Sequence, residues 1–271
     1  MTRVLEDESV DEVRRPGATI RFEETGRRVR VRFANEVVAD SKRVKLMLEP
    51  GRLPVYYFPL SDVRMDLLAP SDHSTDSPHK GTATYWTVRV AGRTAENACW
   101  RYPKPPSEVA DISDYVAFYW HVMDSWWEED DEVFVHPRDP YHRVDVLNSS
   151  RHVRVEIDGV RMAETQRPRL LFETGLPPRY YIPKVDAAME LLAPTETITA
   201  CPYKGRAVYW SAEVNGKLHE NIAWSYPAPI PECPKIENLL AFFNERVDIY
   251  VDGEKQERPV TLWTKVVGSY G

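Results

Sequence analysis

The chain repeats itself. Sliding the sequence by 124 positions aligns residues 28–124 with residues 152–248 without a gap, and 38 of the 97 aligned pairs are identical. A gapless tandem duplication of this length predicts two copies of one fold. The 271 residues suffice for two domains, each large enough to bury its own core.

The copies retain a particular set of residue types. They share mainly Tyr, Trp, Pro, Gly, Lys, Glu and Asn, whereas aliphatic residues have been exchanged freely. If these residues only had to fill the core, the aromatic residues would also have been exchanged for one another or for other apolar residues. This bias indicates that a specific geometry has been kept.

Turn signals make each repeat mainly β. Asp158-Gly159, Asn215-Gly216 and Asp252-Gly253 lie between short alternating runs and suit two-residue type I′ turns. The apolar spacing of 63–68 and 185–192 predicts one short helix per repeat. The prolines after Trp100 and Trp224 predict an extended path, and 115–120 and 239–243 are predicted as buried strands.

The expected organisation follows from the repeat. It comprises an acidic N-terminal arm (1–26), a first β-rich repeat (27–124), an aromatic and acidic linker (125–150), a second repeat with a C-terminal hairpin (151–262) and a tail (263–271).

Composition narrows the classes of function. The formal charge of −7 resides mainly in residues 1–26 and 125–150, and a nucleic-acid partner normally needs a concentrated basic face. No apolar run approaches the ~18 residues of a spanning helix, and the acidic start does not resemble a signal peptide. We therefore expect a cytoplasmic protein with neither nucleic-acid nor membrane partners, and its oligomeric state stays open.

The three cysteines, Cys99, Cys201 and Cys233, contain no CxxC pair. Neither a disulfide framework nor a cysteine-rich zinc site is expected, and no metal or cofactor is predicted.

These motifs resemble a family of domains, the domain of unknown function 427 family, in a tandem version. The second copy carries the pattern at Glu173, Tyr180, Tyr181, Pro183, Cys201, Pro202, Tyr203, Lys204, Gly205, Tyr209, Trp210, Trp224, Tyr226, Pro227, Ala241 and Phe242. The first copy carries it at Glu49, Tyr56, Tyr57, Phe58, Pro59, Pro78, Lys80, Gly81, Tyr85, Trp86, Trp100, Tyr102, Pro103, Ala117 and Phe118.

The resemblance implies a compact domain similar to the β-tent group, which elsewhere uses zinc clips or an aromatic cage. It implies no settled activity, and the Gly-Ser motif with a following Asp-x-Asp pair of nucleotidyltransferases is not present. The first copy departs from the pattern with Ser77 and His79, so thiol chemistry at this turn is restricted to Cys201.

The Lys-Gly turn is the sharpest polar signal. A lysine beside aromatic rings can act as a base or Schiff-base nucleophile, or can hold a carboxylate or phosphate. Alternatively, Lys80 and Lys204 cap backbone carbonyls or pair with Glu49 and Glu173. Lys204 and Lys80 are the best catalytic candidates, although the sequence does not decide whether the protein is an enzyme.

The retained rings either line a pocket or fill the core. Because side chains alternate along a strand, Tyr209 and Trp210 cannot both face one pocket, and we predict Trp210. The predicted ligand-binding residues are Lys204, Tyr181, Trp210, Trp224, Tyr226, Glu173, Lys80, Tyr57, Trp86, Trp100, Tyr102 and Glu49.

These residues predict two alternative functions. The first is binding of a small molecule at a site of Lys and aromatic residues within each repeat or between the repeats, with catalysis left open. The alternative is a non-catalytic interaction module that uses the same aromatic surface.

Overall fold

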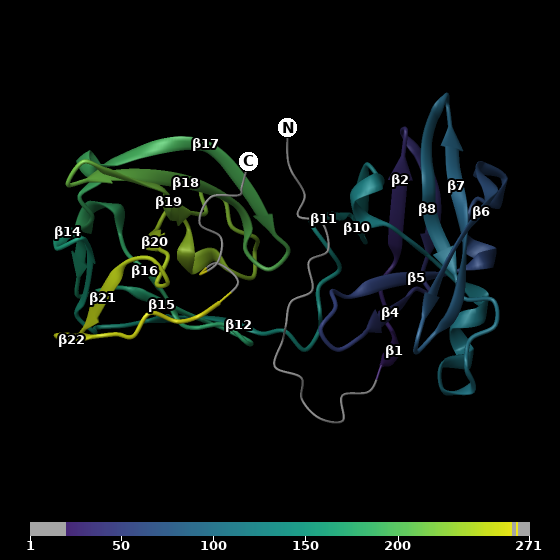
Figure 1. The fold of residues 1–271 in the computed structure, drawn as a ribbon, viewed down its shortest axis with the longest axis horizontal. Helices are drawn as coiled ribbons and strands as arrows, with labels where there is room; N and C mark the ends of the chain where they lie inside the picture. The colour runs from purple at the N-terminus through teal and green to yellow at the C-terminus, as the bar shows by residue number, and fades with distance from the viewer. Residues whose placement is uncertain (1–19, 262–263, 265–271) are drawn as a thin grey trace. The chain divides into compact units, whose positions relative to one another are not determined.

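The computed structural model describes residues 20–261 and 264, and within them the chain divides into two compact units, 20–139 and 140 onward (Figure 1). Each unit is built from strands and short 3-10 turns. The longest helical element described has eight residues. None of the described helices is long and apolar enough to cross a membrane.

The first unit contains two antiparallel sheets. The larger has the order β1-β4-β5-β9-β8-β7-β6, and the smaller has the order β11-β10-β2-β3. Their strands are β1 (Arg21–Glu24), β2 (Val29–Phe33), β3 (Glu36–Ser41), β4 (Lys45–Leu48), β5 (Val55–Pro59), β6 (Leu68–Ser77), β7 (Gly81–Val90), β8 (Arg93–Arg101), β9 (Tyr115–Phe118), β10 (Ser125–Glu128) and β11 (Asp131–Val133).

The second unit repeats this strand order. Strands β12-β15-β16 meet β20-β19-β18-β17 through the isolated bridge between Ile182 and Leu240, and the smaller sheet has the order β14-β13-β21-β22. The strands are β12 (Val144–Asn148), β13 (Val153–Ile157), β14 (Val160–Thr165), β15 (Arg169–Glu173), β16 (Arg179–Tyr181), β17 (Leu192–Cys201), β18 (Gly205–Val214), β19 (Lys217–Ser225), β20 (Leu240–Phe242), β21 (Asp248–Val251) and β22 (Glu254–Lys255). The predicted tandem duplication of a β-rich domain is therefore confirmed.

The hairpin turns form as their sequences predict. Asp158-Gly159 joins β13 to β14, Asn215-Gly216 joins β18 to β19, and Asp252-Gly253 joins β21 to β22. All six residues have positive φ, between 47° and 88°. This is the backbone that a type I′ turn requires.

The expected short helix is instead a pair of 3-10 turns. In the first unit these are η1 (Leu60–Asp62) and η2 (Met65–Leu67), and in the second η5 (Lys184–Asp186) and η6 (Met189–Leu191). Between the turns, Val63 and Ala187 are extended and form β-bridges to Ala39 and Ala163. This pairing with β3 and β14 interrupts the helical spacing. The remaining turns are η3 (Ser107–Asp114), η4 (Trp120–Val122) and η7 (Pro234–Ile236).

Each large sheet is apolar on both faces. Its inner face packs against the small sheet, and in the first unit Phe58 of the large sheet and Val31 of the small sheet belong to the same cluster. Its outer face carries a second cluster that includes Tyr57. Residues 102–114 and 226–239, which we call the covering segments, contribute Ile112 and Ile236 to the outer clusters.

The residues outside the expected repeats belong to the two units. The segment 125–150, predicted as a linker, contains β10 and β11 of the first unit and β12 of the second. The predicted arm 1–26 contains β1, and its residues 1–19 lie outside the described residues, as do 263 and 265–271 of the predicted tail.

Candidate functional site

The Lys-Gly turn lies beneath a covering segment in both units. In the second unit, residues 202–204 join β17 to β18, and the Ile230 N–H donates to the Lys204 carbonyl at 3.1 Å. Gly205 has φ +106°, and a Cβ there would lie 3.2 Å from the Ala228 carbonyl oxygen. Gly81, with φ +82°, approaches the Lys104 carbonyl equally closely. The glycine is therefore required by the backbone crossing.

The turn lysine forms a buried ion pair in each unit. Lys204 Nζ donates to both carboxylate oxygens of Glu173 at 2.6 Å, and the two side chains are 11% and 6% exposed. In the first unit, Lys80 donates to Glu49, with 8% and 11% exposure. Of the alternatives open from sequence, the pairing of each lysine with a glutamate is the one that forms.

Both partners of the second pair are held in their charged forms. Burial alone would raise the pKa of Glu173, but hydrogen bonds from His142 and Lys204 and the charge of Lys204 hold this pKa below its ordinary value. Burial likewise opposes the charge of Lys204, yet the neighbouring Cys201 and Glu173 raise the lysine pKa above its ordinary value. At neutral pH the pair is a carboxylate and an ammonium.

Tyrosine side chains lie near each pair. Burial raises the pKa of Tyr226 well above its ordinary value, and nearby Tyr181 adds to this effect. Burial likewise raises the pKa of Tyr181, whose hydroxyl accepts a 3.1 Å hydrogen bond from Trp224 Nε1.

In the first unit, burial raises the pKa of Tyr102 to about 12. The Lys80 ammonium lies 5.7 Å from the centre of the Tyr102 ring. These phenols remain protonated at neutral pH and can donate hydrogen bonds.

The ring that shares this face is Tyr209, and not Trp210 as predicted. Tyr209 lies opposite Trp224 in the β18–β19 register and packs on the outer cluster. Trp210 packs on the inner cluster, with Lys184 Nζ 4.7 Å from its ring centre. Tyr85 and Trp86 divide in the same way in the first unit. The correction follows from strand alternation, which sends adjacent side chains to opposite faces.

The structure therefore brings together ten of the twelve predicted ligand-binding residues, and Tyr85 and Tyr209 join them to give two equivalent groups. We call these groups the lysine clusters. The first consists of Lys80, Glu49, Tyr57, Tyr85, Trp100 and Tyr102, and the second of Lys204, Glu173, Tyr181, Tyr209, Trp224 and Tyr226.

Three neighbours of the second cluster are not among the predicted ligand-binding residues. His142 Nε2 lies 3.0 Å from Glu173 Oε1, and its ring stacks on Tyr203 at 4.2 Å. The dense polar-aromatic run around residue 142 was the available signal. Cys233 is 2% exposed among the rings of the outer cluster, and no motif marks it.

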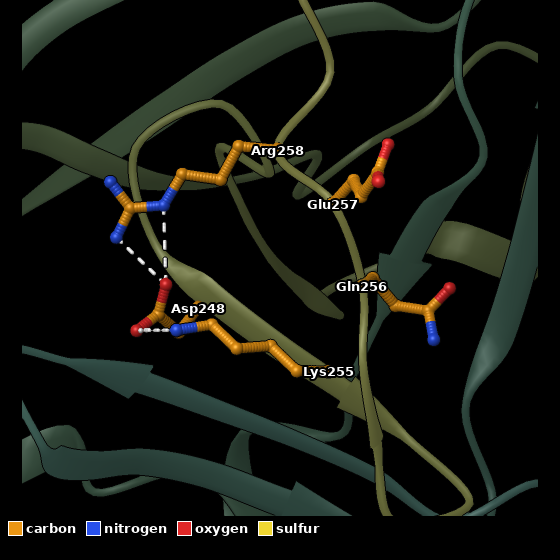
Figure 2. Close-up of a pocket in the computed structure, with 5 residues that line it drawn as sticks. All are labelled: Asp248, Lys255, Gln256, Glu257 and Arg258. Carbon is orange, nitrogen blue, oxygen red and sulfur yellow. Dashed lines mark hydrogen bonds and ion pairs between the residues drawn. The ribbon is translucent and has the colours of Figure 1, made fainter.

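Among residues 20–261 and 264, no group of three or more His, Cys, Asp and Glu side chains could hold a metal ion. An open hollow of about 580 Å³ lies at the C-terminal hairpin (Figure 2), and none of the residues that line it is a predicted site residue. There Asp248 pairs at 2.8 Å with both Lys255 and Arg258, which satisfies its charge at the surface.

Comparison with known proteins gives the family. No curated protein matches the chain. The family model described as "Domain of unknown function (DUF427)" matches twice, over residues 21–129 and 145–253. The first match begins with β1 and the second within β12, so each includes the first strand of a large sheet. The chain accordingly belongs to the DUF427 family and contains its domain in tandem.

Proposed function

We propose that each repeat binds a neutral, polar small molecule at its lysine cluster. The observation that carries the proposal is a buried lysine–glutamate ion pair beside tyrosine side chains, present in both units. Burying an ion pair adds little net stability, because desolvation offsets the attraction. Clusters of perturbed titratable groups are instead typical of functional sites.

Charge balance favours a neutral ligand. Glu173 accepts from Lys204 through both oxygens and cancels its charge. An anionic ligand would have to compete with this buried carboxylate. A lysine ammonium carries three donors, so one more is available for a carbonyl oxygen. Tyr226 and Tyr209 add hydroxyls, and Trp224 adds an apolar wall.

The same balance favours binding over covalent catalysis. A Schiff base requires an uncharged lysine, whereas the raised pKa keeps Lys204 protonated at neutral pH.

A thermal-shift screen tests the proposal. Neutral amides and ring carbonyl compounds should raise the melting temperature, because binding to the native state stabilises it. Their carboxylate analogues should do so less. For a positive compound, calorimetric titration should give two sites per chain.

Charge-removing variants then locate the sites. Lys204→Met combined with Glu173→Gln removes both charges together and should leave one site. The further pair Lys80→Met with Glu49→Gln should leave none. Lys184→Met, on the opposite sheet face, is the matched control and should keep both. Equal binding by the variant without either pair would refute the proposal.

The alternative, a non-catalytic interaction module, has one observation in its favour. In the first unit, Tyr119 lies beside the aromatic rings of the lysine cluster. Its side chain is 37% exposed, and its ring centre lies 4.5 Å from that of Trp100. Exposed aromatic groups of this kind suit protein contacts. Absence of any small-molecule response from the folded protein would favour this function.

A further inference from the structure

The second unit holds two thiols at positions where the first unit carries other residues. Cys201 ends β17 and is partly exposed, and Cys233 lies in the covering segment and is 2% exposed. At the corresponding positions of the first unit stand Ser77 and Val109. The backbone conformations match closely, with φ −131° and ψ 28° at Val109 against φ −126° and ψ 38° at Cys233.

Backbone hydrogen bonds connect the two cysteines. The Lys204 N–H donates to the Cys201 carbonyl at 3.4 Å, the Ile230 N–H donates to the Lys204 carbonyl at 3.1 Å, and the Cys233 N–H donates to the Ile230 carbonyl at 2.9 Å. The bridge between Gly205 and Pro229 fixes the same crossing. The covering segment is thus held against the turn that ends β17.

The two side chains also share their surroundings. Tyr181 and Lys204 each interact electrostatically with both thiols, and the thiols interact with each other. Burial raises the pKa of Cys233 to about 11, although the Lys204 charge opposes this rise. Cys201 is the more exposed thiol and is the one that a reagent reaches first.

We propose that Cys201 and Cys233 form a redox-active pair that reacts with small disulfides. The Cys201 thiolate attacks one sulfur of the disulfide, forms a mixed disulfide and releases the first small thiolate. The Cys233 thiolate then attacks the Cys201 sulfur and releases the second. The protein is oxidised by two electrons, the small disulfide is reduced to two thiols, and the product is a Cys201–Cys233 disulfide.

The disulfide would tie the covering segment covalently to the lysine turn. This chemistry does not depend on the small-molecule binding proposed above, so either proposal can fail alone. Its substrate is any small disulfide that reaches Cys201, and oxidised glutathione serves as the probe.

Intact mass spectrometry of the native full-length chain tests the pair. With oxidised glutathione, the wild type should lose two hydrogens and retain no glutathione, and peptide mapping should find residues 201 and 233 linked. Cys233→Ser should instead keep one glutathione on Cys201, and Cys201→Ser should remain unmodified. Cys99, fully buried in the first unit, is the internal control and should stay reduced.

The proposal is overturned by three results. They are a wild type that does not react, one that retains glutathione as Cys233→Ser does, and a disulfide that involves Cys99. A second variant keeps the test independent of the native cysteines. Ser77→Cys with Val109→Cys, in a Cys201→Ser background, should create an equivalent disulfide in the first unit, because the backbone conformation at Val109 already matches that at Cys233.

Discussion

At the scale of single residues, the lysine–glutamate pair determines what substitutions cost. Lys204→Met should destabilise the second unit by about 3–5 kcal/mol, because it leaves the Glu173 charge buried without its ammonium partner. Lys184→Met, which loses only a contact with Trp210, should cost about 1 kcal/mol or less. Urea denaturation measures both. Adding Glu173→Gln to Lys204→Met should recover much of the loss, and equal costs for the two lysines would contradict the prediction.

The same pair predicts how stability depends on pH. The folded pKa of Glu173 lies below its ordinary 4.5, so its stabilisation is present above pH 4.5 and is lost as pH falls through the lower folded value. The folded pKa of Lys204 lies above its ordinary 10.5, so its stabilisation is present below pH 10.5 and is lost as pH rises through the higher folded value. The stability difference between wild type and the Glu173→Gln, Lys204→Met variant should therefore shrink at both extremes. A difference that is constant with pH would exclude this linkage.

Individual site residues were predictable to different degrees. The repeat singled out Lys204, Glu173 and Trp224, because both copies retain them. It could not choose between Tyr209 and Trp210. Both are retained aromatics, and alternation gives opposite faces without saying which face is covered. Which of the two rings faces the lysine depends on the covering segment, residues 226–239, which packs on one face of the sheet in the folded structure.

At the scale of elements, the crossing of the lysine turn and the covering segment is set by one glycine. Gly205→Ala should destabilise the second unit, because its Cβ would meet the Ala228 carbonyl oxygen at 3.2 Å and the Ile230 nitrogen at 3.4 Å. Gly216→Ala is the control, with φ +74° and nothing within 4 Å of the added Cβ. It should cost about 1 kcal/mol from the backbone strain alone. Thermal unfolding should show Gly205→Ala costing a further 1–3 kcal/mol, roughly the cost of overpacking. If the two variants lost equal stability, the covering segment would move to accommodate the added Cβ without strain.

Elements whose conformation depends on their own local sequence could be predicted. Strands that form only because they pair with a neighbouring strand could not. The Asp158-Gly159 turn needs only its own two residues. In contrast, β1 and β12 occupy equivalent edges of the two large sheets, yet residues 21–24 and 145–148 share no identity. A ladder depends on backbone groups and tolerates any side chain at an exposed edge. The structural repeat therefore extends further toward the N-terminus of each unit than the sequence identity does.

At the scale of the whole molecule, each unit has its own inner and outer core. The inner clusters contain Phe118 in the first unit and Phe242 in the second, each 2% exposed and matched by the repeat. All members of each cluster come from one unit. The cores that stabilise residues 20–139 and those that stabilise residues 140–261 are therefore separate sets of contacts.

Separate cores predict separate loss of protection. Phe242→Ala should destabilise the second unit by about 3–5 kcal/mol, because the lost ring leaves a cavity in a packed core. Amide hydrogen exchange should then accelerate across β13 to β21 and remain unchanged in β2 to β10. Phe118→Ala should give the mirror result. If either substitution accelerated exchange in both units, the tandem repeat would unfold as one cooperative structure, and stability would be shared beyond the two cores.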